Sequence, residues 1–188
     1  MTKHRFDPLT QTLHWLVALL VITSYAIGVV REELPKGDFR SWLLTVHMSL
    51  GMIVFALSVV RLMWRSITPA PRPVDGQSSG ARLAAKAGHI LLYGAMFAVP
   101  VAGLLGAWIK GRTVGFFNLA ILPTPFPVDK SLGSQIEHLH TFAGHAMMLL
   151  AGGHAVAAIA HQVWLKDGTL GRMLPFLSAR PAQVMPAE

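Results

Sequence analysis

The sequence contains no cysteine. This absence excludes disulfide bonds, thiolate zinc sites, cysteine-ligated iron–sulfur clusters and covalent attachment of a c-type haem. Charged residues are also scarce, because Asp, Glu, Lys and Arg make up only 13% of the 188 residues, whereas 53% are hydrophobic. An ordinary soluble domain has about 25% charged residues. So few charges would cover a soluble surface poorly, so the composition favours a membrane protein.

The formal net charge of +7 raises the question of nucleic-acid binding. The basic residues, however, lie between long apolar runs, and they form neither a polybasic tail nor one face of an amphipathic helix. This arrangement is typical of charges that orient a protein in a membrane. We therefore expect the membrane as a partner and no nucleic acid.

Four runs of the sequence contain no Asp, Glu, Lys or Arg: 8–30, 41–60, 87–109 and 138–165. A helix needs about 20 apolar residues to cross a bilayer, and only helical backbone satisfies its own hydrogen bonds there. The sequence therefore predicts an all-α, multi-pass integral membrane four-helix bundle. Its helices should span about 8–30, 41–64, 84–109 and 138–165, within one domain at 1–175.

The remaining segments are interpreted as connections. The uncharged run 113–128 is short and contains three prolines, which predicts an ordered or interfacial loop. Residues 67–80 are rich in Pro, Gly and Ser and predict a linker, and 176–188 predicts a disordered tail. The first apolar run could instead be a cleaved signal peptide, but it contains His14 and Trp15, lacks a clear cleavage site and precedes three more runs.

The distribution of Lys and Arg predicts the orientation. Four spans would place on one side Lys3, Arg5, Arg61, Arg65, Arg72, Arg82, Lys86, Lys166, Arg172 and Arg180. The opposite side would carry Arg31, Lys36, Arg40, Lys110, Arg112 and Lys130. The side richer in Lys and Arg is normally cytoplasmic, so both termini should be cytoplasmic.

Nine histidines are unusual in so apolar a chain, and ionisable groups inside spans are usually functional. His14 begins the first span and His47 begins the second, so the two should lie at opposite faces of the membrane. On the fourth span, His140 and His154 share a helix face within about 40° and lie about 21 Å apart along the axis. This spacing predicts two centres at different depths.

We expect His47 to pair with His140 near the outer face, and His14 to pair with His154 nearer the cytoplasm. Two imidazoles on facing helices with a flat macrocycle between them form a six-coordinate haem, which favours electron transfer over oxygen binding. His161 shares the face of His154 within about 20° and stays a competing ligand on geometry alone.

Other interpretations of these histidines stay open. A lone histidine in a span can simply bond a neighbouring helix, and this is preferred for His89, which is left without a partner. His138 and His145 are expected to be non-ligands, and His4 to be solvated. Paired histidines could also bind Zn or Cu, but the spans hold no carboxylate or thiolate to complete such a site.

Small residues accompany the proposed ligands: Gly51 follows His47, Gly144 follows His140, and Gly152 and Gly153 precede His154. Glycine would give a haem edge room against a helix. Ordinary packing between membrane helices uses glycine as well, so neither interpretation is preferred for any single glycine.

Several motifs, taken together and in order, resemble the bacterial cytochrome b561 family. They are Leu13-His14-Trp15, Val46-His47-Met48-Ser49-Leu50-Gly51, Gly88-His89-Ile90-Leu91-Leu92-Tyr93, His140 with His154, and Lys166-Asp167-Gly168-Thr169-Leu170 followed by Arg172-Met173. The likeness extends from about Thr10 to Pro175. It implies a bundle with two non-covalent haems b, bis-His ligands at His14, His47, His140 and His154, and electron exchange with quinone in the bacterial inner membrane. It also favours His154 over His161.

Within that family the short, stand-alone chain is most similar to the superoxide oxidase branch. That likeness implies an oxidoreductase that passes electrons from superoxide at the outer face to ubiquinone, with no obligatory protein partner. An anionic substrate needs nearby positive charge, which predicts Lys110 and Arg112 as substrate-attracting residues; both could instead be solvated interfacial anchors. The alternatives are an electron-transfer or anchor subunit for a dehydrogenase or hydrogenase, and a haem-free, His-based metal transporter.

Overall fold

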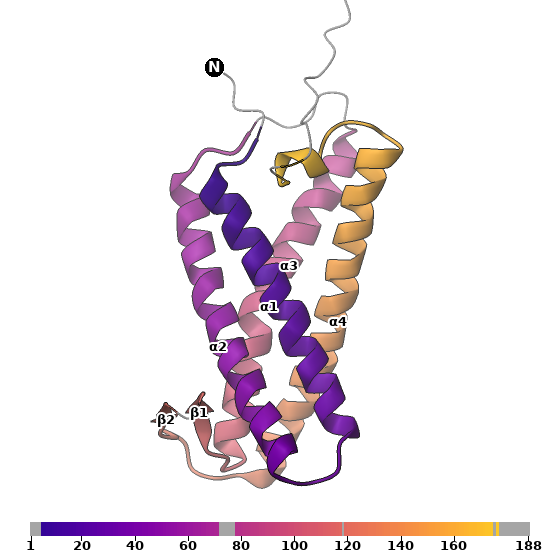
Figure 1. The fold of residues 1–188 in the computed structure, drawn as a ribbon. Coiled ribbons are helices and arrows are strands. Elements are labelled where there is room, and N and C mark those ends of the chain that lie inside the picture. Colours follow the sequence, from indigo (N-terminus) through magenta and orange to yellow (C-terminus); the bar gives the residue numbers. More distant parts are fainter. Residues whose placement is uncertain (1–4, 72–77, 118, 175, 177–188) are drawn as a thin grey trace, which may run out of the picture.

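The computed structural model describes residues 5–71, 78–117, 119–174 and 176. Within these residues the chain forms four long helices, α1 (Pro8–Glu33), α2 (Asp38–Ile67), α3 (Ser79–Ile109) and α4 (Lys130–Val163), shown in Figure 1. All four are long and apolar enough to cross a membrane. The predicted all-α, four-helix membrane fold is confirmed.

Side-chain caps fix where three of these helices begin. The Asp7 carboxylate accepts a hydrogen bond from the Thr10 backbone N–H, and Ser78 does the same for Ala81. Asp129 accepts from both Ser131 and Leu132, so α4 begins at Lys130, earlier than the predicted start at 138. The predicted start lies too far along the chain because a search for charge-free runs stops at Glu137. The helix itself can begin before that charge, because the Asp129 cap satisfies its first backbone donors.

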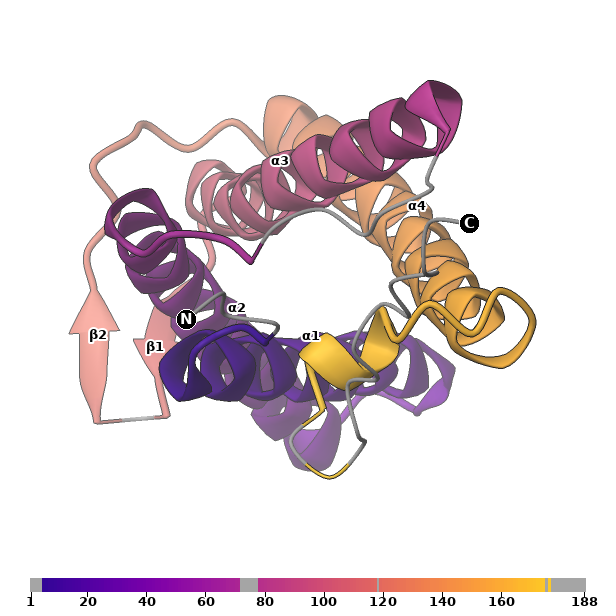
Figure 2. The same cartoon turned by 90° about the horizontal axis from the view of Figure 1, so that it is seen from above.

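The helices pack unevenly around the bundle axis, which Figure 2 views end-on. α1 packs mainly on α2 and α3 mainly on α4, with a smaller contact between α2 and α3. α1 and α4 have little backbone contact, and a hydrogen bond of 2.8 Å between the Tyr25 hydroxyl and His145 Nδ1 connects them instead. The bundle is therefore two helix pairs that face each other.

The connection between α3 and α4 carries a small hairpin that the sequence did not predict. β1 (Val114–Phe116) pairs antiparallel with β2 (Ala120–Leu122), next to the end of the bundle where α3 ends (Figure 1). Ser49 on α2 is fully buried beneath it. Its hydroxyl accepts a hydrogen bond of 2.8 Å from the Phe117 N–H and donates one of 2.7 Å to the Thr45 carbonyl. We call this end of the bundle the hairpin end.

At the opposite end, which we call the terminal end, the chain after α4 returns to α1. The short 3-10 helix η1 (Leu170–Arg172) lies there. The Trp15 indole donates a hydrogen bond of 2.8 Å to the Met173 carbonyl, and the Gln11 amide donates one of 3.3 Å to the Arg172 carbonyl. We call the segment from Leu170 to Met173 the strap. It joins α1 to the end of α4, where the two helices have little direct contact.

The buried core is small and centred on Val17, Met96, Val99 and Met147. Large apolar side chains such as Leu19 and Leu149 are exposed on the outside of the bundle. A soluble surface rarely carries so many, and a lipid environment would cover them. α1 begins and α4 ends at the terminal end, as an even number of spans requires; a cytoplasmic location for that end stays a prediction. Residues 72–77 of the linker and 177–188 of the predicted disordered tail lie outside the described residues.

Candidate functional site

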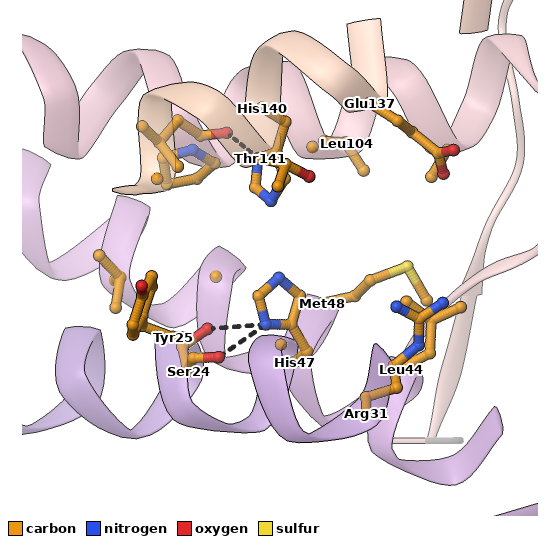
Figure 3. A pocket seen from close by; sticks show the side chains of 18 of the residues that line it. Ser24, Tyr25, Arg31, Leu44, His47, Met48, Leu104, Glu137, His140 and Thr141 are labelled. Carbon is orange, nitrogen blue, oxygen red and sulfur yellow. Dashed lines mark hydrogen bonds between the residues drawn. The ribbon is translucent and has the colours of Figure 1, made fainter. Parts of the chain in front are cut away.

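A cavity of about 680 Å³ lies between the two helix pairs, towards the hairpin end. Figure 3 shows its interior, with His47 on α2 and His140 on α4 facing each other across it. A volume of this size is typical of sites for cofactors and other small molecules. The cavity therefore contains the pair predicted for the outer face.

The His47 and His140 rings are both held through Nδ1. His47 Nδ1 lies 2.8 Å from the Ser24 carbonyl, and His140 Nδ1 lies 2.9 Å from the Val99 carbonyl. Because a carbonyl can only accept a hydrogen bond, Nδ1 of each neutral ring carries the proton. Each Nε2 then keeps a lone pair, as a metal-binding histidine requires.

The separation of the rings can be compared with the geometry of a metal between two axial ligands. With metal–nitrogen bonds of about 2 Å and half a ring beyond each, two axial imidazoles place their ring centroids roughly 6 Å apart. The centroids of His47 and His140 lie 5.9 Å apart, and those of His14 and His154 lie 6.3 Å apart. Both predicted pairs are brought together, and both separations fit a six-coordinate haem.

His89 has a neighbour that the sequence analysis did not foresee. Its ring centroid lies 5.3 Å from that of His154 on α4, so His89 contacts a neighbouring helix. The sequence analysis did not identify His154 as this neighbour because the helix-face arithmetic compared spacings within α4, whereas His89 lies on α3. The distance is shorter than the roughly 6 Å that suits two axial ligands, and the His89 side chain is exposed.

The Nδ1 environment of His14 differs from those of His47 and His140. A guanidinium nitrogen of Arg61, Nη2, lies 3.0 Å from His14 Nδ1. The same guanidinium lies over the Tyr93 ring, 5.2 Å from its centroid. His14 Nδ1 thus faces a donor where the other two rings face an acceptor.

The remaining histidines have other contacts. His145 bonds Tyr25, and His161 Nδ1 lies 2.5 Å from Asp167 Oδ2. His138 lines the cavity on the same helix as His140, and His4 lies outside the described residues. The Asp167 contact gives His161 a role at the turn after α4, which supports treating it as a non-ligand.

Two glycines that the sequence analysis overlooked seat the histidines of the cavity. A Cβ at Gly103 would lie 2.8 Å from Cε1 of His140, and a Cβ at Gly28 would lie 3.1 Å from Cε1 of His47. Each glycine lies on a different helix from the histidine that it contacts, so a search for glycines near each ligand in the sequence could not find it. At the glycines that the sequence analysis singled out, an added Cβ would meet no described atom within 4 Å outside the neighbouring turns of its own helix: Gly51, Gly144, Gly152 and Gly153. They border open space.

The two residues predicted to attract substrate are both ion-paired. Lys110 and Arg112 each bind the Glu137 carboxylate, with Arg112 Nη2 3.1 Å from Oε1. All three line the cavity, as do Arg31 and Arg40. Glu137 lies one helical turn before His140. The side chains of Lys110, Arg112 and Glu137 are partly exposed, so this part of the cavity lining meets solvent, and we call it the mouth of the cavity.

Among the residues that the structure describes, no group of three or more His, Asp and Glu side chains is arranged to hold a metal ion. The histidines instead occur as facing pairs, and the His47–His140 pair lies across the cavity. This arrangement favours a macrocycle that supplies the other four ligands over a bare Zn or Cu site.

Comparisons with known proteins show which family the chain resembles. The family model described as prokaryotic cytochrome b561 matches residues 5–176. The chain is 30% identical to Cytochrome b561 homolog 2 of Escherichia coli K12, over 92% of this chain and 93% of that protein. It is 29% identical to the Probable superoxide oxidase CybB of Yersinia pestis, over 87% and 92% of the two chains. It is 32% identical to Cytochrome b562 of Cereibacter sphaeroides, over 87% and 90%.

Proposed function

Because the chain belongs to the prokaryotic cytochrome b561 family of haem-binding membrane electron-transfer proteins, we propose that it is a di-haem oxidoreductase that passes electrons from superoxide to ubiquinone. In this proposal the hairpin end faces the outside of a bacterial inner membrane, and the terminal end faces the cytoplasm. His47 and His140 hold the outer haem b, and His14 and His154 hold the inner one.

The observation that carries the proposal is a cavity that holds a facing histidine pair and has four cationic side chains at its mouth. Arg31, Arg40, Lys110 and Arg112 line the cavity that contains His47 and His140. An anion approaching this mouth is attracted by their charge, more strongly at low ionic strength. The relative from Yersinia pestis, which is named a probable superoxide oxidase, supports the same choice of donor.

Bound haem supplies reversible one-electron chemistry, and the chain's residues set where it takes place. The carbonyls of Ser24 and Val99 fix the tautomer of His47 and His140, so that Nε2 points into the cavity (Figure 3). If His47 and His140 both hold the haem, its iron would have no open position for oxygen. The residues thus favour transfer through the centre over reaction at it.

The overall reaction balances with superoxide, quinone and two protons from water. Two superoxide ions give up one electron each and leave as dioxygen. One quinone takes the two electrons and two protons and becomes quinol. On α4, the 14 residues from His140 to His154 span about 21 Å, so two haems at these depths would carry electrons across most of the apolar layer.

A spectrum and an assay test this proposal. Purified protein should show the reduced-minus-oxidised spectrum of haem b, with two haems per chain by pyridine haemochrome. Enzymatically generated superoxide should then reduce a ubiquinone analogue, and superoxide dismutase should abolish the reaction. A colourless protein would contradict the haem proposal and favour a His-based transporter. A haem protein that reduces quinone only when a co-purified dehydrogenase is present would favour the subunit alternative.

A further inference from the structure

Arg61 is a cation inside a predicted span, and none of the residues that the structure describes gives it an anionic partner. Its guanidinium is half-buried on α2, and its Nε is inaccessible and has no hydrogen-bond partner. Among the described residues, no carboxylate forms an ion pair with it; its contacts are His14 Nδ1 and the face of Tyr93. A charged group at this depth in a membrane protein is costly unless it is paired.

The contact with His14 is incompatible with metal binding by that histidine. A guanidinium can only donate hydrogen bonds, so His14 Nδ1 accepts from Arg61 and the neutral ring carries its proton on Nε2. Nε2 is the atom that has to bind iron if His14 faces His154. His47 and His140 show the opposite arrangement, in which Nδ1 points at a carbonyl and Nε2 is free.

Both anomalies disappear if an anion takes the place of His14 as the partner of Arg61. Haem b has two carboxylates on one edge, and these are its only peripheral anionic groups. Arginine binds a carboxylate through two parallel hydrogen bonds, for which Nε and one terminal nitrogen form the natural fork. The unpartnered Nε of Arg61 supplies the donor that its present contact with His14 leaves unused.

We propose that the Arg61 guanidinium moves away from His14 and binds a carboxylate of the inner haem. The move would free Nδ1 of His14, so that its ring can act as a ligand of the iron through Nε2. The proposal rests on the assignment of His14 and His154 as the inner pair. Tyr93 keeps the guanidinium against its ring face and limits the motion to a short swing from His14 to the haem edge. Arg61 is therefore a cofactor-binding residue.

The experiment compares haem b with its dimethyl ester, which has the same ring and iron but no carboxylate. His140→Ala is introduced first, so that the inner site is the one measured, and apoprotein is titrated with each macrocycle. The His140→Ala protein, which keeps its native Arg61, should bind haem about tenfold more tightly than the ester. The ester lacks the carboxylate and so loses a hydrogen-bonded ion pair. Arg61→Gln should bind the two macrocycles with similar affinity.

Arg65→Gln is the matched control. Arg65 lies one turn further along α2, where it donates to the Thr68 carbonyl and lies over the Phe6 ring. This variant should keep the full preference for haem over the ester, and Arg61→Lys should keep part of it. On the His140 background, retention of the characteristic spectrum of the inner haem in each variant checks that the bundle has folded.

Two results would overturn the proposal. One is equal binding of haem and the ester by the His140→Ala protein with native Arg61, which would show that no carboxylate is recognised. The other is an Arg61→Gln variant that keeps the tenfold preference, which would place the anion contact on another residue. If the His140→Ala protein binds no macrocycle at all while the parent protein is coloured, the failure lies in the ligand assignment of the proposed function.

Discussion

Gly103 on α3 lies so close to His140 on α4 that an added Cβ would be 2.8 Å from the imidazole Cε1. The glycine thus sets the position of a proposed haem ligand from the opposite helix. His140 Nδ1 bonds the Val99 carbonyl one turn earlier on the same helix, so α3 fixes both the ring's place and its tautomer.

We expect Gly103→Ala to weaken binding of the outer haem. The added methyl group must push the His140 ring from its seat, and overpacking of this kind costs about 1–3 kcal/mol. Alanine favours the helix itself, so α3 should not be destabilised. Haem content per chain should fall from two towards one. The control is Gly94→Ala on the same helix, where a Cβ meets no atom within 4 Å; equal haem content in both variants would show that the seat tolerates a methyl group.

The second prediction concerns which neighbour of His154 binds the inner haem with it. The His14 ring lies 6.3 Å from that of His154 and the His89 ring lies 5.3 Å from it, and only the first separation suits two axial ligands. His14→Ala should therefore remove the inner haem, whereas His89→Ala should keep both haems and the low-spin spectrum. The measurements are pyridine haemochrome quantitation and electron paramagnetic resonance. Loss of the inner haem in His89→Ala, with retention in His14→Ala, would exchange the two assignments.

The sequence was sufficient for the spans and for the two depths of His140 and His154 on α4, because both depend on arithmetic along one helix. Charge-free runs locate helices in lipid, and the spacing of His140 and His154 on one helix needs no knowledge of the other helices. The signals that failed all concern contacts between helices. Gly103, His89 and Arg61 acquire their roles from side chains far away in the sequence, and no periodicity in a single sequence records which faces meet.

Loop chemistry explains the other differences. The hairpin at Val114–Phe116 and Ala120–Leu122 was missed because two three-residue strands are too short for a recognisable alternation. Glu137 was treated as the residue before a span, although it lies inside α4 and pairs with both Lys110 and Arg112. Those two cations were predicted to attract the substrate, and the structure adds the Glu137 carboxylate as a counter-charge to both.

The third prediction concerns Glu137 and the rate at which superoxide, an anionic donor, reduces the protein. Its carboxylate offsets part of the positive charge at the cavity mouth, so Glu137→Gln should raise the rate of reduction by superoxide, roughly two- to tenfold at low ionic strength. Lys110→Gln should lower it, with haem content unchanged in both. The checks are stopped-flow haem reduction at several salt concentrations and the same measurement with a neutral reductant, which should not respond.

Glu33→Gln serves as the control for this prediction, since Glu33 is exposed at the same end of the bundle. A general effect of net charge would act through Glu33 as well, whereas the ion pairs involve Glu137. Rates that are independent of salt in every variant would remove the electrostatic role of these residues.

The last prediction concerns the turn after α4 and how the stability of the protein depends on pH. Partial burial alone would raise the pKa of Asp167, but hydrogen bonds from His161 and Thr169 outweigh it, so the pKa of this carboxyl is lowered from its ordinary value of 3.8. A carboxyl whose pKa is lowered by folding stabilises the folded state above its unfolded pKa. That contribution is lost as the pH falls below about 4 and through the lowered value. The strap that joins α4 to α1 should therefore loosen in acid.

Thermal unfolding, followed by tryptophan fluorescence between pH 3 and pH 7, measures this loss. The parent protein should lose stability below about pH 4, and Asp167→Asn should be less stable at pH 7 but flatter across the acid range. Asp38→Asn, at the exposed start of α2, should follow the parent curve. Trp15 adds a local signal, because its indole bonds the Met173 carbonyl on the strap. Parallel curves for the parent protein and Asp167→Asn would mean that the acid response arises elsewhere, since only a carboxyl at position 167 can take up the proton that breaks the His161 contact.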